Sequence, residues 1–86
     1  MPQISTFYGL TIFMYYRDHL PPHFHAMYGD TEAIVSLLSL DVIEGNLPPR
    51  ARRLVLEWAR LQRPALLDDW ERACVHAPLS PIPPLD

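Results

Sequence analysis

The spacing of apolar residues changes once along this chain, close to Leu47, and this change constrains the fold more than any other feature. Residues 4–44 are rich in Ile, Val, Phe, Tyr and Thr, in short runs separated by glycine and proline, which is typical of strands joined by turns. After Leu47 apolar residues recur every three or four positions, which predicts amphipathic helices. The order of the two patterns predicts an α+β fold, with an N-terminal antiparallel β-meander of three or four strands followed by two C-terminal helices on one sheet face.

The helical half is divided by Pro64. Pro48 and Pro49 suit the first turn of the first helix, where a missing N–H costs nothing. Pro64 interrupts the pattern, and a second helix is predicted to run to about His76. The apolar sides consist of Ala51, Leu54, Val55, Trp58 and Leu61 in the first helix, and of Leu66, Leu67, Trp70, Ala73 and Cys74 in the second. We expect both tryptophans to be core or interface anchors and the cysteine to be a small buried residue.

A chain of 86 residues is long enough for one domain and too short for two. Residues 1–76 are predicted to form a single α+β domain, and residues 77–86, which contain four prolines, a Pro-rich C-terminal tail that is extended or packs across a neighbour. Because a domain of this size buries only about 60 to 65% of its unfolded surface, we expect it to associate, for example as a homo-oligomer.

The charge of the chain bears on its partners. Ten acidic residues and seven arginines, with no lysine, give a net charge of −3, the opposite sign from a typical nucleic-acid binder. Any RNA contact would need a local patch, and Arg53 and Arg60 on the polar side of the first helix are the candidates. Glu57 lies between them at helical spacing, so a solvated face held by intrahelical ion pairs is the alternative.

The cysteine count and the apolar runs bear on the compartment. A single cysteine, Cys74, cannot form an internal disulfide. The N-terminal residues lack the pattern of a signal peptide, and no run approaches the roughly 20 apolar residues that span a bilayer. We therefore expect a cytoplasmic protein with no membrane partner.

The Gly-Asp pair at 29–30 predicts a central hairpin and its register. A two-residue loop there pairs Phe24 with Val35 on an apolar face that should lie under the helices. His23 and His25 then emerge side by side on the opposite face, which lacks helical cover.

The strand before this hairpin is expected to pair back across residues 17–22. In the predicted register, Ile12, Met14 and Tyr16 lie beside the two histidines. Phe13 and Tyr15 lie on the side of the sheet that faces the helices. The predicted interface on the uncovered face consists of Ile12, Met14, Tyr16, Met27 and Ile34.

Polar side chains concentrate in the nine residues from Arg17 to His25. His23 and His25 share a face and can share an ion, with His19 or Asp18 completing the shell. The predicted ligands of a divalent metal are therefore His23, His25 and Asp18.

The same cluster suits metal-independent cleavage of RNA. One imidazole among His19, His23 and His25 would take a proton from a ribose 2′-hydroxyl and another would protonate the leaving oxygen, while Arg17 would stabilise the charge on phosphorus. Histidines of this kind also serve structure or partner contact, bonded to a turn carbonyl or stacked on tyrosine. The residues leave these alternatives open.

Four segments carry a family resemblance: MPQISTFYG, RDHLPPHFHAMYGD, LDVIEGNLPPRARRLVLEWA and DDWERA. With them the chain resembles, over about residues 1–84, the small prokaryotic proteins grouped as domain of unknown function 4160. That family often has Pro where this chain has Leu20, and Lys in its helices where this chain uses only Arg.

Members of this family are commonly encoded beside another small protein, in pairs that resemble toxin–antitoxin modules. The resemblance therefore implies a bacterial toxin–antitoxin-like component whose partner is the protein encoded by the neighbouring gene, and it implies no reaction. Our first hypothesis is association through the His-bearing sheet face. The alternatives are a ribonuclease-type toxin that binds RNA and a His-x-His metal-binding protein, so whether the chain is an enzyme stays open, and no cofactor other than a metal is expected.

Overall fold

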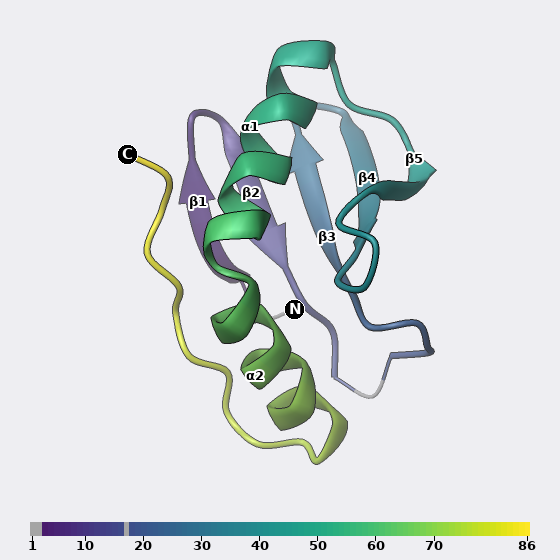
Figure 1. Ribbon diagram of the computed structural model, residues 1–86, viewed down its shortest axis with the longest axis vertical. Coiled ribbons are helices and arrows are strands. Elements are labelled where there is room, and N and C mark those ends of the chain that lie inside the picture. The colour runs from purple at the N-terminus through teal and green to yellow at the C-terminus, as the bar shows by residue number, and fades with distance from the viewer. Residues whose placement is uncertain (1–2, 17) are drawn as a thin grey trace.

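The structure is a computed structural model that describes residues 3–16 and 18–86, and it consists of one antiparallel sheet followed by two helices (Figure 1). The five strands lie in the sheet in chain order. The α+β prediction is confirmed, with five strands where three or four were expected. The elements are β1 (Gln3–Phe7), β2 (Leu10–Phe13), β3 (His23–Tyr28), β4 (Thr31–Ser36), β5 (Val42–Gly45), α1 (Pro49–Leu61) and α2 (Arg63–Cys74).

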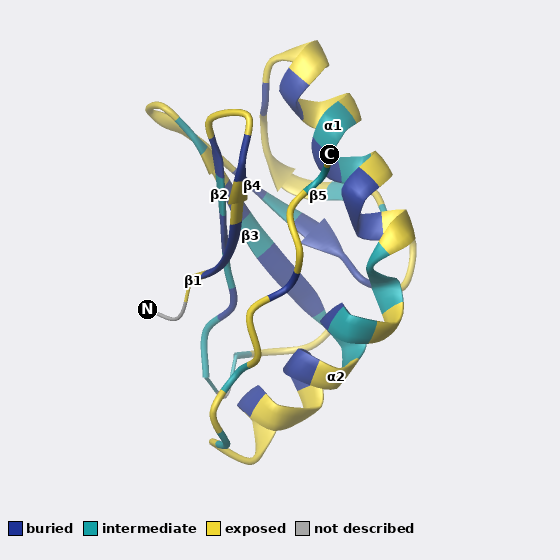
Figure 2. Ribbon diagram, turned by 90° about the vertical axis from the view of Figure 1, so that its left-hand side faces the viewer, coloured by how far each residue is buried: buried dark blue, intermediate teal, exposed yellow. Residues whose placement is uncertain are grey.

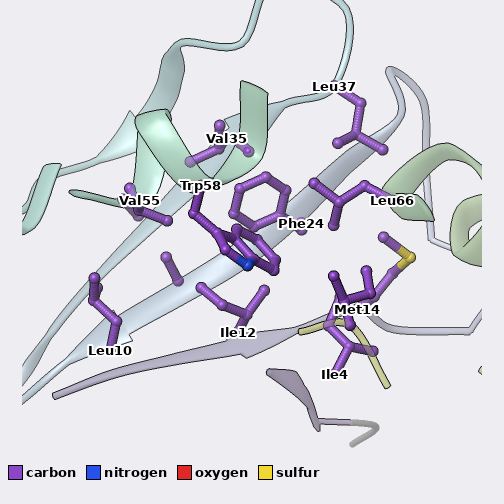
Figure 3. Close-up of a cluster of buried hydrophobic side chains, with 14 of the residues drawn as sticks. Ile4, Leu10, Ile12, Met14, Phe24, Val35, Leu37, Val55, Trp58 and Leu66 are labelled. Atoms are coloured by element: carbon purple, nitrogen blue, oxygen red, sulfur yellow. The ribbon is translucent and has the colours of Figure 1, made fainter. Parts of the chain in front are cut away.

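The two helices lie on the same side of the sheet and leave the other side without helical cover (Figure 2). Trp58 of α1 is fully buried, with its ring centroid 5.2 Å from that of Phe7 and 5.7 Å from that of Phe24 (Figure 3). Trp70 of α2 is also buried, as predicted. Cys74 is exposed, contrary to the prediction, because the last turn of α2 directs Ala73 into the core and the next residue outward. Among the described residues, neither helix is long and apolar enough to cross a membrane.

The hairpin of β3 and β4 has the register that its turn predicts. Phe24 pairs with Val35, and His25 pairs with Ile34, across a loop in which Gly29 has a φ of +59°. Phe24 and Val35 are fully buried under the helices. The turn residues thus place the two histidine positions on the opposite side of this strand.

The predicted register of β2 is wrong by one residue. Ile12 pairs with Ala26 and Phe13 pairs with His25, so Ile12 and Met14 lie in the core and Phe13 lies on the histidine side. The connection between β2 and β3 is a long irregular loop, which does not specify a register. The tight turn at residues 8–9, where Tyr8 and Gly9 both have positive φ, instead fixes the pairing of β2 with β1 and places Leu10 opposite the buried Phe7.

The C-terminal strap, which we define as residues 77–86, lies beside β1 and α1 (Figures 1 and 2). The backbone N–H of Ile82 donates to the carbonyl of Ile4 at 2.8 Å, which pairs the strap with the outer edge of β1. The indole N–H of Trp58 donates to the carbonyl of Pro83 at 2.8 Å. The strap therefore joins the N-terminal strand to the helical layer.

Asp69 of α2 anchors the same strap from inside the protein. Its side chain is buried, and its Oδ1 accepts a hydrogen bond from the backbone N–H of Ser80 at 2.8 Å. Its Oδ2 has no hydrogen-bond partner among the described residues. Burial raises the pKa of the Asp69 carboxyl, and the hydrogen bond from Ser80 opposes that rise without cancelling it.

We expect Asp69→Asn to be more favourable relative to wild type at pH 7 than at pH 4, because asparagine keeps the acceptor for Ser80 and removes the buried charge, while the amide N–H groups that replace Oδ2 have no acceptor at either pH. An acid whose pKa is raised by folding contributes stability that is complete below its unfolded pKa of about 3.9 and is lost as the pH rises through the folded pKa. The stability of the variant relative to wild type should therefore fall as the pH is lowered from 7 to 4. Urea unfolding of both proteins at the two pH values measures it, and a relative stability that rises on acidification would contradict the argument.

Candidate functional site

The polar cluster predicted from the sequence forms where the loop between β2 and β3 folds back onto the start of β3. One carboxylate oxygen of Asp18, Oδ2, lies 2.9 Å from Nε2 of His23 and 3.3 Å from Nε2 of His25. The three ligand atoms lie within 4.8 Å of one another. Donors bound to one tetrahedral ion at about 2.0 to 2.2 Å are themselves about 3.3 to 3.6 Å apart, so the distance between Asp18 and His25 fits a metal centre and that between Asp18 and His23 is shorter.

Each imidazole of the cluster has an oxygen atom next to both of its ring nitrogens. Nδ1 of His23 lies 2.6 Å from the carbonyl oxygen of Pro21, and Nδ1 of His25 lies 3.2 Å from Oε2 of Glu32. A carbonyl oxygen can only accept, so Nδ1 of His23 must carry a proton and donate it. A neutral His23 would then turn the lone pair of Nε2 toward the carboxylate of Asp18, whereas a ring protonated on both nitrogens would donate to it, and only the donated contact lowers the pKa of Asp18.

The two histidines differ in burial, which corrects the expectation that both emerge on the uncovered face. His23 is only 1% exposed, and its ring centroid lies 5.3 Å from that of Trp70. The reason is that α2 lies near the end of the sheet where β3 begins (Figure 1), so its tryptophan covers the first residue of that strand. The side chain of His25 is 13% exposed and contacts the ring of Tyr15, with centroids 4.4 Å apart.

The environment of Asp18 keeps its carboxyl ionised. Burial alone would raise the pKa of Asp18, but the backbone N–H of His19 donates to Oδ1 at 2.8 Å and the imidazoles of His25 and His23 contact Oδ2. Together these contacts hold the pKa of Asp18 below its usual value. The cluster therefore presents an anionic oxygen to both Nε2 atoms.

Of the two other predicted catalytic residues, the structure describes only His19. Arg17 lies outside the described residues. The side chain of His19 is 77% exposed, and its ring centroid lies 5.1 Å from that of His23. Its Nε2 is 3.7 Å from Oδ1 of Asp18, so it borders the metal-ligand set without joining it.

The predicted interface residues divide between the two sides of the sheet. Ile12 and Met14 are buried in the core, and Tyr16 stacks on His76 with ring centroids 4.5 Å apart. Met27 and Ile34 follow the alternation of the histidine side, and Met27 is exposed. The predicted nucleic-acid residues Arg53 and Arg60 are exposed on α1.

Glu32 and Trp70 contribute to the site, and reasoning from the sequence missed both. Glu32 contacts Nδ1 of His25 from the neighbouring strand β4. The predicted hairpin register already placed Glu32 on the face of His25, one diagonal step away, and that was the available signal. The contact of Trp70 with His23 depends on the packing of α2, and nothing in the sequence indicates it.

Comparison with protein-family models gives one match. The model described as Domain of unknown function (DUF4160) matches residues 9–71, which include the whole polar cluster. The chain belongs to this family. No curated protein and no solved structure matches the chain significantly.

Proposed function

We propose that this DUF4160 protein binds a divalent transition-metal ion through Oδ2 of Asp18, Nε2 of His23 and Nε2 of His25. The observation that carries the proposal is the oxygen acceptor beside each Nδ1 atom, Pro21 for His23 and Glu32 for His25. Metal-binding histidines almost always donate their second ring N–H to a carbonyl or a carboxylate, and this contact fixes the ring and its tautomer.

An alternative arrangement of protons would also satisfy these contacts, with both imidazoles doubly protonated. That arrangement would place two positive rings with centroids 5.3 Å apart, one of them 1% exposed. The carboxylates of Asp18 and Glu32, which contact the rings, offset part of the repulsion between them, and the cost of burying a charged His23 ring opposes this arrangement. A metal ion avoids both costs, because two neutral imidazoles and the Asp18 carboxylate then direct three lone pairs to one point.

The donor set indicates the class of metal. Two imidazole nitrogens and one carboxylate suit Zn²⁺, Fe²⁺ and related first-row ions, whereas Ca²⁺ and Mg²⁺ prefer shells of oxygen. Three protein ligands leave at least one position of a four-coordinate ion for water or another ligand. Because His25 and Asp18 are only partly buried, solvent can reach the cluster from their side.

Titration of the untagged protein with Zn²⁺ in a calorimeter tests the proposal. We expect one ion per chain with micromolar or tighter affinity, and no comparable heat with Mg²⁺. Co²⁺ should give the strong visible absorption of a four-coordinate site. His76→Ala is the matched control, since it removes an imidazole outside the cluster and should leave binding unchanged. The proposal would be ruled out if Zn²⁺ did not bind to wild type, or if His76→Ala lost the binding of Zn²⁺.

A second candidate function is association with the protein encoded by the neighbouring gene, within a toxin–antitoxin-like module. The observation that favours it is the uncovered side of the sheet (Figure 2), where Phe13, Met27 and Ile34 retain accessible apolar surface. Sedimentation of the two proteins together tests it, and separate monomers would contradict it. A metal-independent ribonuclease receives less support, because His23 is nearly inaccessible to a substrate.

A further inference from the structure

A third imidazole, that of His19, lies at the edge of the proposed metal site. The backbone N–H of His19 donates to Oδ1 of Asp18 at 2.8 Å, which holds this residue against the carboxylate that the other two imidazoles contact. Nε2 of His19 lies 3.7 Å from the same Oδ1. The Nε2 atoms of His19, His23 and His25 therefore all face one carboxylate group.

The other ring nitrogen of His19 has the same kind of neighbour as in the two buried or partly buried imidazoles. Nδ1 of His19 lies 3.2 Å from the carbonyl oxygen of Leu20. Because a carbonyl oxygen can only accept, this Nδ1 donates a proton, and a neutral ring keeps its lone pair on Nε2, toward Asp18. An oxygen atom beside the second nitrogen is the contact that orients metal-binding histidines. All three histidines share this feature.

The spacing of the three rings fits one tetrahedral ion. The centre of an imidazole ring lies about 1.15 Å from its nitrogen atoms, so two rings bound to one ion at about 2.0 to 2.1 Å have centroids about 5.1 to 5.3 Å apart. The centroid of His23 lies 5.1 Å from that of His19 and 5.3 Å from that of His25. The distance from His23 to His19 therefore fits a pair of ligands as well as the distance from His23 to His25 does.

His19 reaches a shared ion by a movement of its own side chain. Its Nε2 lies outside the set of ligand atoms that are all within 4.8 Å of one another, so it must turn further toward Oδ2 of Asp18. This side chain is 77% exposed and belongs to a loop, so little packing opposes the turn. Glu32 cannot take the same place, because its carboxylate contacts Nδ1 of His25, on the opposite edge of that ring from Asp18.

We infer that Nε2 of His19 is the fourth ligand of the ion, which completes a shell of three imidazoles and one carboxylate. This inference rests on the metal site proposed above. A shell of four protein ligands leaves no position for water or a substrate, which is typical of structural rather than catalytic zinc sites. Two of the ligands come from the loop between β2 and β3 and two come from β3. The ion therefore ties this loop to the sheet and takes no part in a reaction.

Visible spectroscopy of the untagged protein with Co²⁺ tests the fourth ligand, with sodium azide as the probe of an open position. Wild type should show the absorption of four-coordinate Co²⁺, and azide should leave it unchanged. In His19→Ala, azide or free imidazole should shift the spectrum, and the affinity for Zn²⁺ should fall by at least the roughly tenfold that loss of an outer contact costs. His76→Ala also removes an exposed imidazole and should behave as wild type.

Three results would overturn the inference and leave the three-ligand site of the proposed function intact. The first is a change in the Co²⁺ spectrum of wild type on addition of azide. The second is equal affinity of wild type and His19→Ala for Zn²⁺. The third is a dimer of wild type that forms with Zn²⁺ in sedimentation and is lost in His19→Ala, because His19 would then bind the ion of a second copy.

A wild type that binds neither Zn²⁺ nor Co²⁺ would instead contradict the proposed function, and the inference with it. Because the side chain of His19 is exposed, His19→Ala should fold as wild type does. Circular dichroism of the two proteins without metal should therefore be the same. A loss of affinity in a variant with an unchanged spectrum then reports the loss of a ligand.

Discussion

Asp18→Asn should lower the affinity for Zn²⁺ by about 100-fold, equivalent to about 2.8 kcal/mol. The substitution removes the one anionic ligand that both Nε2 atoms share. Asparagine is chosen because its oxygen can still accept the hydrogen bond from the backbone N–H of His19, so the loop keeps its conformation. We expect Zn²⁺ to raise the melting temperature of wild type by mass action and to have little effect on the variant.

Glu32→Gln should lower the affinity for Zn²⁺ by less than Asp18→Asn does. It alters only the outer contact to Nδ1 of His25, and contacts of this kind contribute roughly tenfold to a hundredfold to metal affinity. We expect a loss of about tenfold, clearly smaller than that of Asp18→Asn. If the two variants lost the same affinity, Glu32 would be a ligand itself, and if neither lost any, the ion would be bound elsewhere.

Trp58→Ala should cost about 3 to 5 kcal/mol of folding stability, a large part of the total for a domain of this size. The indole is fully buried and contacts the rings of Phe7 and Phe24, of which Figure 3 shows Phe24, and alanine would leave a cavity there. It would also leave the carbonyl of Pro83 without its donor. Urea unfolding followed by circular dichroism measures the loss, and a loss below about 1 kcal/mol would show that this core repacks freely.

Trp58→Phe tests the hydrogen bond to Pro83 in a protein that still has an aromatic ring in its core and should still fold. Phenylalanine keeps an aromatic ring in the core and removes the N–H that holds Pro83 of the C-terminal strap, together with part of the volume of the indole. We expect a loss of about 1 to 2 kcal/mol. Proteolysis should show earlier cleavage in the strap than in wild type. An unchanged cleavage pattern would mean that the contacts of Ile82 and Asp69 are sufficient to hold the strap.

The local turn signals explain which parts of the fold the sequence predicts. The Gly-Asp pair at 29–30 specifies a two-residue turn, and the register of β3 and β4 follows from it residue by residue. The strand before it has no such link to β3, and its register was predicted wrongly. The turn at Tyr8 and Gly9 would have corrected this, because it places Leu10 opposite Phe7 and so puts Ile12 in the core.

In the candidate site, too, the features set by neighbouring residues are predicted from the sequence, and those set by the packing of a distant helix are not. Alternation along one strand predicts that His23 and His25 share a side, and short separation brings Asp18 to them. The burial of His23 depends on where α2 packs, and the helical periodicity of α2 does not encode its position over the sheet. The sequence therefore indicates the three ligands of the proposed metal site and does not indicate that His23 is buried.

The contacts of the strap have a consequence for the order in which the chain can fold during synthesis. The outer edge of β1 receives its hydrogen bond from Ile82, and the indole of Trp58 finds its acceptor only at Pro83. Translation must therefore proceed almost to the last residues of this sequence before the first strand is fully bonded. Until that point a nascent chain on the ribosome exposes an open strand edge, a feature through which incomplete chains pair with one another and aggregate.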